Sequence, residues 1–413
     1  MTIQRGVALI AAAAFCRSLA IGLMGVTLGI ELARSGYDAL RIGLVIAAGL
    51  AGSAAATLVT SFHADRLGRR RTLLSLSLLS AGGGAGFAVS GGFGWLMAVA
   101  FFGMVNGMGR DRGAAFALEQ AVIPQAVSAV RRTLALSWYN LVIDSGHALG
   151  ALGGALPTVL ERVWALSPAT AYREMFGLYA ALYGASAVLY SLLGGDVELG
   201  ATGAAKRRVP LTPQSRRRVA GLAGLFGLDA FGGGLLGDAL ISYWFFRRFG
   251  IPAAAVGPLF FGVHALNSLS YLAAAWLARR IGLVNTIVFT HLPSSLLLIA
   301  VPLAPSFGWA AALYLARAAL VEMDVPTRQS FVVAVVRPEE RVFASGVTNL
   351  TRNVAWMAGP GLAGWLMQEV SLGAPLLVGG GFKIAHDLLL WAAFRSVKPP
   401  EEAGGTRANE GKA

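Results

Sequence analysis

Long apolar segments recur along the whole chain and constrain its fold more than any other feature. A bilayer-spanning helix needs about 20 mostly apolar residues, because only a helix satisfies every backbone polar group inside hydrocarbon. Twelve such helices would use roughly 240 residues, which agrees with a 56% hydrophobic share in 413 residues. The segments lie at about 7–33, 40–62, 72–90, 94–113, 133–157, 172–194, 218–246, 254–278, 283–303, 307–325, 342–368 and 373–395. The sequence therefore predicts an all-α integral membrane protein with twelve transmembrane helices.

Charged residues are too few for a soluble multi-domain protein. They make up 13% of the chain, against roughly 25% in an average soluble domain. The net charge of +13 would suggest nucleic acid in a soluble protein, but no nucleic-acid-binding signature is present, so we expect no such partner. The single Cys16 lies in a predicted helix and allows no intramolecular disulfide.

The longest polar stretch separates six apolar segments from the other six. We predict an N-terminal six-helix bundle at 1–194, a cytoplasmic inter-bundle loop at 195–217, a C-terminal bundle at 218–398 and a polar tail at 399–413. With both termini in the cytoplasm, 21 Lys and Arg residues fall on the cytoplasmic side and 6 on the other, as the positive-inside rule requires. We expect a monomeric, multi-pass protein of the inner cell membrane.

The two halves of the chain resemble each other. Residues 64–68 are similar to 278–282 at an offset of 214, and Gly150 corresponds to Gly361 at an offset of 211. Because these loops run in the same direction, they predict parallel repeats about a pseudo-twofold axis along the membrane normal. Such repeats are typical of transporters that rock two halves around a central site.

Residues 61–71, SFHADRLGRRR, resemble the loop between helices 2 and 3 of the major facilitator superfamily, written G-x-L-A-D-R-x-G-R-R. Ser61 and His63 stand in place of the Gly and the Leu. The matching residues are Asp65, Arg66, Gly68, Arg69 and Arg70. With twelve helices and the basic central loop, the resemblance extends over essentially the whole chain. It implies a secondary transporter that works by alternating access. Asp65 would pair with nearby arginines or a helix N-terminus and latch the outward-open state.

Further resemblances concern the direction of transport. Residues 358–364, AGPGLAG, and 146–154, GHALGALGG, are similar to the G-P-x-x-G-G motif of exporters, with the Pro in the second half instead of the first. Asp324–Gln329 and Arg337–Arg341 resemble the end of helix 10 and the following loop in efflux-type members. These likenesses favour export, although small residues at this spacing also serve helix packing.

Six ionisable residues fall at one depth of the predicted bilayer. A charge at the bilayer centre costs roughly 3 kcal/mol or more, so each needs a partner or a water-filled cavity. Counting about 1.5 Å per residue from the nearer helix end places them at the midplane. They are Arg17, Asp144, Asp229, His264, Arg317 and Arg352. Together they predict a substrate and proton site.

Arg17 and Asp229 occupy matching places in the two halves at an offset of 212, so we expect them to pair across the cavity. Asp229 or Asp144 would bind the coupling proton, because burial and a nearby arginine push the pKa of a carboxyl in opposite directions. Arg17 and Arg352 would then hold an anionic substrate group or release the acid. A purely structural salt bridge is the alternative.

Aromatic and amide residues complete the predicted site, where an amphiphilic solute could stack and hydrogen-bond; packing or an interfacial belt is the alternative. These are Trp138, Tyr139, Asn140, Asn349, Asn353 and Trp356. Charges at inner helix ends, with the loop residues 65–70, predict a cytoplasmic gate. These are Arg110, Asp111, Arg112, Glu119, Glu322, Asp324 and Arg328. Lys383 and Asp387, four residues apart, predict a local ion pair.

No nucleotide-binding glycine loop, nucleophile elbow or zinc motif is present. We therefore expect no enzyme activity, no cofactor and no metal site. The predicted function is proton-coupled export of a polar or amphiphilic small molecule, with protons, the substrate and the lipid bilayer as partners. One alternative is a proton symporter that imports an organic anion, and another is a transport-inactive membrane receptor or scaffold.

Overall fold

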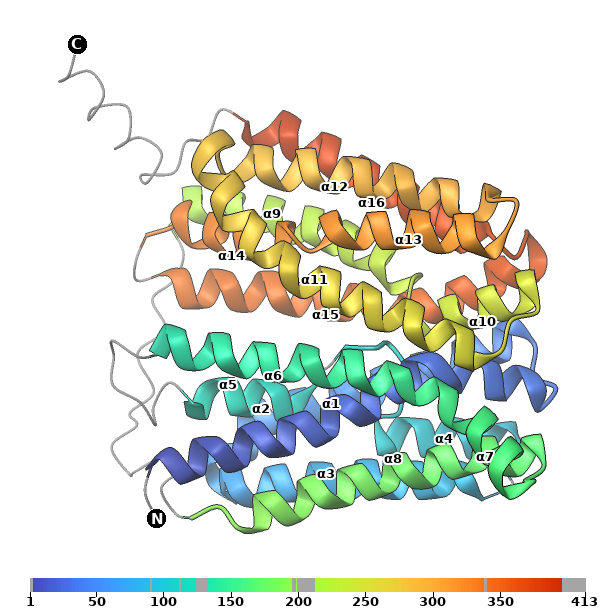
Figure 1. The fold of residues 1–413 in the computed structure, drawn as a ribbon. Coiled ribbons are helices and arrows are strands. Elements are labelled where there is room, and N and C mark those ends of the chain that lie inside the picture. Colours follow the sequence, from blue (N-terminus) through green and yellow to red (C-terminus); the bar gives the residue numbers. More distant parts are fainter. Residues whose placement is uncertain are drawn as a thin grey trace. The chain divides into compact units, whose positions relative to one another are not determined.

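The computed structural model describes residues 3–89, 91–110, 113–123, 132–194, 198, 212–337 and 340–395, which are almost entirely helical (Figure 1). The helices are α1 (Ile3–Arg34), α2 (Ala39–Leu67), α3 (Arg69–Ala88), α4 (Phe93–Gly103), α5 (Ala114–Val122), α6 (Arg132–Leu152), η3 (Gly153–Ala155), α7 (Leu156–Trp164), α8 (Pro168–Ser191), α9 (Pro213–Gly234), α10 (Asp238–Phe249), α11 (Ala253–Ile281), α12 (Leu283–Ala300), η5 (Val301–Leu303), α13 (Phe307–Val321), α14 (Asp324–Ala334), α15 (Arg341–Glu369) and α16 (Ala374–Phe394).

These helices account for the twelve predicted spans, which confirms the all-α, twelve-helix prediction. Six helical stretches are long and apolar enough to cross a membrane by length and composition, among them Arg5–Arg34 and Ala374–Phe394. Four spans consist of two helices each: α4 with α5, α6 with α7, α9 with α10, and α13 with α14. Helix breaks of this kind are tolerated at membrane depth where protein surrounds the freed backbone groups.

The break in the fourth span shows where the sequence prediction was wrong. The apolar segment 94–113 is not one helix, because α4 ends at Gly103. Met104 then takes a left-handed conformation with φ 57°, and Gly107 and Gly109 follow with φ 60° and 71°. Three left-handed residues within six positions cannot continue a right-handed helix. The chain becomes helical again only at Ala114.

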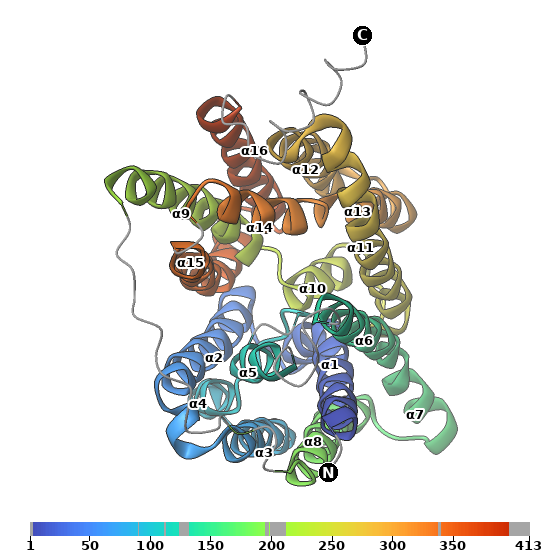
Figure 2. The ribbon, with the colours of Figure 1, turned by 90° about the vertical axis from the view of Figure 1, so that its left-hand side faces the viewer.

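The described chain divides into two compact units. The first comprises Met1–Ala204, Gly237–Ala265 and Pro360–Leu372, and the second comprises Ala205–Leu236, Leu266–Gly359 and Gly373–Ala413. In the first unit α1 packs against α6, α8 and α10, as the end-on view shows (Figure 2). In the second unit α12 packs against α13, α14 and α16, and α16 against α9. The first unit thus contains residues from both sides of the predicted boundaries at 194 and 218. The division of the chain into two bundles at these boundaries stays a prediction.

Glycines that resemble the exporter motif lie where helices touch. An added Cβ at Gly150 of α6 would come 2.2 Å from the carbonyl oxygen of Leu19 in α1. At Gly364 of α15 it would come 2.3 Å from the carbonyl oxygen of Ala39 in α2. Any larger residue would push these helix pairs apart. Packing therefore explains both glycines, as the alternative interpretation held.

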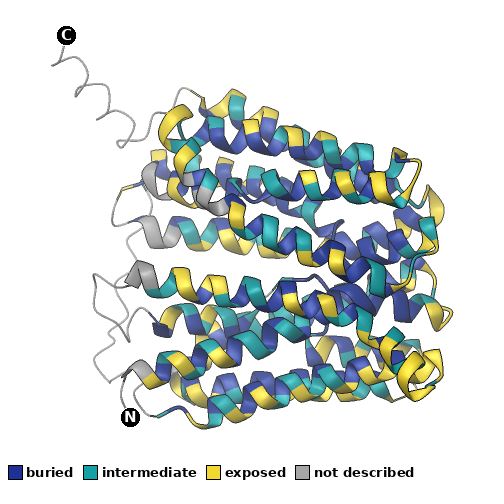
Figure 3. Cartoon of the chain, in the orientation of Figure 1, coloured by how far each residue is buried: buried dark blue, intermediate teal, exposed yellow. Residues whose placement is uncertain are grey.

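Large apolar residues also occupy exposed helix positions, and Figure 3 marks the exposed positions along the helices. Phe62, Leu78, Phe102, Trp309 and Leu389 are each at least half exposed. These residues lie on five different helices, and apolar exposure on many helices is expected where the surface faces lipid. The burial pattern therefore agrees with a multi-pass membrane protein.

Glu340 joins the start of α9 to the loop before α15. Its carboxylate accepts hydrogen bonds from the Thr212 N–H at 2.7 Å, the Ser215 hydroxyl at 2.6 Å and the Arg337 N–H at 3.1 Å. These bonds favour the ionised form. They lower the pKa of Glu340 to about 2 from its usual 4.5, with the Ser215 hydroxyl as the largest contribution.

We expect Glu340→Gln to lower the thermal stability of the detergent-solubilised protein at pH 7. Because the folded pKa lies below the unfolded one, the stability from this group is present above about pH 4.5 and is lost as the pH falls towards 2. The difference in melting temperature between wild type and variant should therefore shrink below pH 4.5. Glu369→Gln, at an exposed position of α15, is the matched control. A difference that stays constant across this range would contradict the prediction.

Candidate functional site

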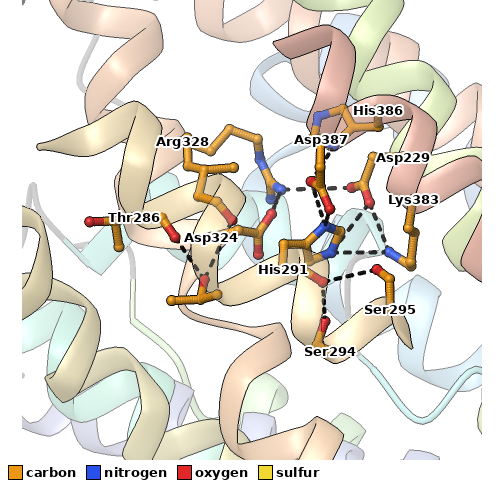
Figure 4. Close-up of polar contacts among 12 residues, drawn as sticks. Asp229, Thr286, His291, Ser294, Ser295, Asp324, Arg328, Lys383, His386 and Asp387 are labelled. Carbon is orange, nitrogen blue, oxygen red and sulfur yellow. Dashed lines mark hydrogen bonds and ion pairs between the residues drawn. The ribbon is translucent and has the colours of Figure 1, made fainter. Parts of the chain in front are cut away.

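A buried cluster of ionisable side chains lies in the second unit, around Asp229 of α9 (Figure 4). It draws residues from α9, α12, α14, α15 and α16, which are far apart in sequence. The members are Asp229, His291, Asp324, Arg328, Arg352, Lys383, His386 and Asp387. Charged residues inside membrane helices are rare and mark substrate, ion or proton pathways. This cluster is therefore the candidate functional site.

Asp229 is the centre of the cluster and is 4% exposed. Lys383 Nζ donates a hydrogen bond to its Oδ1 at 2.7 Å, and Arg352 Nη1 donates to its Oδ2 at 3.0 Å. Arg328 Nη1 lies 3.8 Å from the same Oδ2. Three cations from three helices thus surround one carboxylate, which compensates the cost of burying its charge.

Two histidines form the second layer of the cluster. His291 Nδ1 lies 2.9 Å from Asp387 Oδ1, and His386 Nδ1 lies 3.0 Å from the same oxygen. An ionised carboxylate only accepts hydrogen bonds, so we assign the proton of each imidazole to Nδ1. His291 Nε2 then faces Lys383 Nζ at 3.4 Å and lies 3.7 Å from Asp229 Oδ1. His386 Nε2 is buried and makes no hydrogen bond to the described residues.

The cluster also contains a group with metal-ligand character, although the sequence predicted no metal site. Single ligand atoms of Asp229, His291 and His386 lie within 4.8 Å of one another. The Lys383 ammonium lies against two of these residues, at 2.7 Å from Asp229 and 3.4 Å from His291. A metal ion would have to displace this ammonium, so the donor set as arranged fits protons better than a metal.

Arg17 of α1 pairs with Glu119 of α5 in the first unit. Arg17 Nη2 lies 2.6 Å from Glu119 Oε2, and Nη1 lies 3.3 Å from Oε1. Glu119 also accepts hydrogen bonds from the Tyr139 hydroxyl at 2.6 Å and the Tyr190 hydroxyl at 2.5 Å. The structure thus gives Arg17 and Asp229 different partners, each within its own unit, and a pair between them stays a prediction. The sequence had placed Glu119 in the gate.

The two pairs are related by the internal repeat with their charges reversed. Arg17 corresponds to Asp229 at an offset of 212, and Glu119 and Arg328 both lie in the fourth span of their half, in α5 and α14. Each half therefore joins its first span to its fourth by opposite charges. The repeat conserves the position of the interaction while the sign of each partner changes. For this reason the offset identified Arg17 and Asp229 as equivalent positions but not their partners.

The other predicted midplane residues are distributed over both units. Asp144 Oδ1 of α6 lies 4.0 Å from His147 Nδ1, and the ring centres of His147 and His264 of α11 are 5.8 Å apart, all within the first unit. In the second unit Arg317 is buried, with Cζ 5.4 Å from the ring centre of Tyr314 and no hydrogen bond from its Nε to the described residues.

The predicted lining residues differ in exposure. Tyr139 is buried and its hydroxyl donates to Glu119. The other predicted lining residues on α6 and α15 have more exposed side chains. Trp138, Asn140, Asn349 and Asn353 are exposed, and Trp356 is half-buried. Exposure alone does not separate a lining role from an interfacial belt. Their part in substrate binding stays a prediction.

The described gate residues are distributed over both units, and their common role as a gate stays a prediction. Asp324 and Arg328 of α14 pair with each other and belong to the Asp229 cluster. In the loop part of the predicted gate, Glu198 accepts hydrogen bonds from the Arg69 N–H at 2.7 Å and the Arg70 N–H at 3.1 Å, just after Gly68 with φ 91°. Arg66 is exposed, Arg110 is half-buried and Glu322 is buried. Asp111, Arg112 and the Asp65 side chain lie outside the described residues.

Sequence reasoning missed most of the second layer of the cluster. Lys383 and Asp387 were interpreted as a local pair, but Lys383 binds Asp229 and Asp387 binds His291 and His386. Three ionisable residues within one apolar segment of α16 were the available signal, since such residues need partners. His291 gave no comparable signal because it stands alone in its segment.

We expect a double-mutant cycle to separate these clusters. Arg17→Met and Glu119→Gln should each destabilise the detergent-solubilised protein by about 3 kcal/mol, because each leaves a buried group without its partner. The double variant should lose clearly less than the sum. The cycle of Arg17→Met with Asp229→Asn should be additive, since each residue is engaged by partners of its own unit. Strong coupling in the second cycle, measured by thermal unfolding, would support the pair predicted from sequence.

Comparison with known proteins gives the family. The family model described as Major Facilitator Superfamily matches residues 10–323. An uncharacterized membrane protein of Saccharomyces cerevisiae is 26% identical over 428 residues, which cover 95% of each chain. A crystal structure of the nucleoside transporter NupG aligns with a TM-score of 0.75 at 12% identity, covering 94% of this chain and 99% of that one. The human organic anion transporter MFSD10 aligns with a TM-score of 0.60 at 19% identity, covering 94% and 100%. Because the family model spans well over half of the residues, the chain belongs to the Major Facilitator Superfamily.

Proposed function

We propose that the protein is a proton-coupled secondary transporter in which the Asp229 cluster takes up the coupling proton. Membership of the superfamily makes the chain a multi-pass membrane transporter rather than an enzyme. The observation that carries the proposal is the continuous chain of contacts from Asp229 through Lys383 and His291 to Asp387. Histidine is the side chain that changes charge between about pH 5 and 8.

The contacts suggest what a proton does in this network. Neutral His291 donates from Nδ1 to Asp387, while its Nε2 can accept a hydrogen bond from Lys383. A proton on Nε2 removes that acceptor and places two positive groups 3.4 Å apart. Asp229 Oδ1, 3.7 Å from Nε2, is then the carboxylate placed to pair with that nitrogen, since Asp387 already binds Nδ1. Protonation would therefore turn Asp229 towards His291 and loosen the hold of Asp229 on Lys383.

The charge balance of the cluster bears on the cargo. With both histidines neutral, the carboxylates of Asp229, Asp324 and Asp387 are balanced by three cations. These cations are Arg328, Arg352 and Lys383. One added proton leaves a net positive charge, which is costly in a buried site unless an anion enters with it. Cooperative binding of a proton and an anion favours co-transport. The geometry thus favours proton symport of an organic anion over the proton-driven export that the sequence motifs favoured.

We expect His291→Gln and Asp387→Asn to uncouple transport from protons. Substrates would first be found by thermal shift of the purified protein with monocarboxylates, dicarboxylates, amino acids, nucleosides and sugars, since a ligand of the folded state raises its melting temperature. In proteoliposomes both variants should lose most pH-gradient-driven accumulation, about tenfold or more, and keep counterflow exchange. His63→Gln, at an exposed position of α2, should behave as wild type. Normal accumulation by both cluster variants would refute the proposed proton site.

The sign of the proton movement separates symport from exchange. Proteoliposomes filled with a pH-sensitive dye would receive substrate from outside, without an initial pH gradient. Symport carries protons inward with the substrate, so the lumen should become more acidic. Exchange carries protons outward and would make the lumen more alkaline. An alkaline shift would return the assignment to proton-coupled export, and no shift would exclude proton coupling.

A further inference from the structure

Two helix breaks from different halves of the chain meet inside the first unit. One is the non-helical segment 104–110 between α4 and α5, and the other is the junction before α10. The Ala239 N–H of α10 donates a hydrogen bond to the Gly107 carbonyl at 2.9 Å. The Ser242 hydroxyl donates to the Gly25 carbonyl of α1 at 3.0 Å. These two hydrogen bonds join α10 to the 104–110 segment and to α1.

Asp238 lies at this meeting point as the first residue of α10. Its carboxylate packs directly on Gly109, where an added Cβ would come 1.7 Å from Asp238 Oδ2. Gly25 of α1 leaves similar room, with an added Cβ 3.1 Å from Asp238 Cβ. Gly109 also has φ 71°, which side chains rarely adopt. The backbone at the break is thus shaped to admit one carboxylate.

One buried histidine, His264, contacts this carboxylate, and a second, His147, packs beside the first. His264 Nε2 of α11 lies 3.2 Å from Asp238 Oδ2. The ring of His147 of α6 is centred 5.8 Å from that of His264, and Asp144 Oδ1 lies 4.0 Å from His147 Nδ1. Both histidines are at most 6% exposed. Charged residues on the neighbouring elements include Arg17 and Glu31 on α1, Arg110 at the end of the 104–110 segment, and Asp144 on α6. Arg17 is engaged by Glu119.

We propose that His264 and Asp238 form a second proton-binding site, separate from the Asp229 cluster, which holds α10 and α11 to α1 and α6 when it is protonated. A proton on His264 turns its contact with Asp238 into an ion pair within a buried region, where such attraction is strongest. Loss of the proton leaves a buried carboxylate beside a neutral ring and weakens the joint at both helix breaks. This proton-dependent contact, the His264 latch, rests on the proposed function in one respect. It assumes that a transporter must separate α10 and α11 from α1 and α6 during its cycle.

The test is a double-mutant cycle of His264→Gln and Asp238→Asn at several pH values. Melting temperatures of the purified full chain would be measured between about pH 8 and 5.5, with His63→Gln as the exposed control. We expect the wild type to gain at least about 2 °C over His264→Gln as the pH falls, and the coupling between residues 264 and 238 to grow in parallel. A pH-independent difference would indicate a merely structural contact and overturn the proposal.

A second measurement uses the wild type, in case a variant fails to fold. Hydrogen exchange at the C2 position of each histidine, followed by mass spectrometry, reports its titration directly. Titration of His264 between pH 5.5 and 8 supports the latch, and a His264 that stays neutral throughout overturns it. The two proposals remain distinguishable. His291→Gln should abolish coupling and keep the His264 effect, whereas His264→Gln should keep proton-driven accumulation while shifting its pH profile.

Discussion

A carboxylate between membrane helices is tolerated only when cations and hydrogen-bond donors compensate its charge, and the second unit is organised around this requirement at Asp229. Lys383 and Arg352 donate to its two oxygens from α16 and α15, and Arg328 approaches from α14. Removing any one partner leaves buried charge without compensation, which costs far more than an exposed ion pair contributes. The site therefore also holds the unit together.

The same constraint applies in the first unit, where the central buried charge is positive instead of negative. Arg17 is buried between apolar helices, and Glu119 meets it with both oxygens while two tyrosine hydroxyls occupy the remaining acceptor positions. This pair is fully satisfied, whereas the Asp229 cluster contains His386 Nε2 without a hydrogen bond to the described residues. A satisfied network resists a change of protonation, and one with a vacant acceptor admits it. This difference supports a structural role for the Arg17–Glu119 pair and a functional role for the Asp229 cluster.

Helix breaks give the chain its other functional feature. Left-handed residues at 104, 107 and 109 end α4 and bring Gly109 against Asp238. A backbone with lost helical hydrogen bonds is easier to rearrange than an intact helix. Placing titratable groups at such a joint makes its strength depend on pH. Proton uptake would then have a different role in each unit. At the Asp229 cluster of the second unit it would couple transport to protons, and at His264 of the first unit it would strengthen the contact at the helix breaks.

The sequence by itself determined the twelve spans and the absence of an ordinary soluble fold, and it predicted the depth of Asp229, Arg17 and Arg352. These follow from apolar length and from the cost of each charge, which depend on one segment at a time. The tertiary structure alone decided the partners, because Arg17 meets a residue 102 positions away and Lys383 meets one 154 positions away. It also decided that 94–113 is broken, since apolar composition carries no information on local φ angles. Depth is a property of the segment, but pairing depends on how helices rotate and pack.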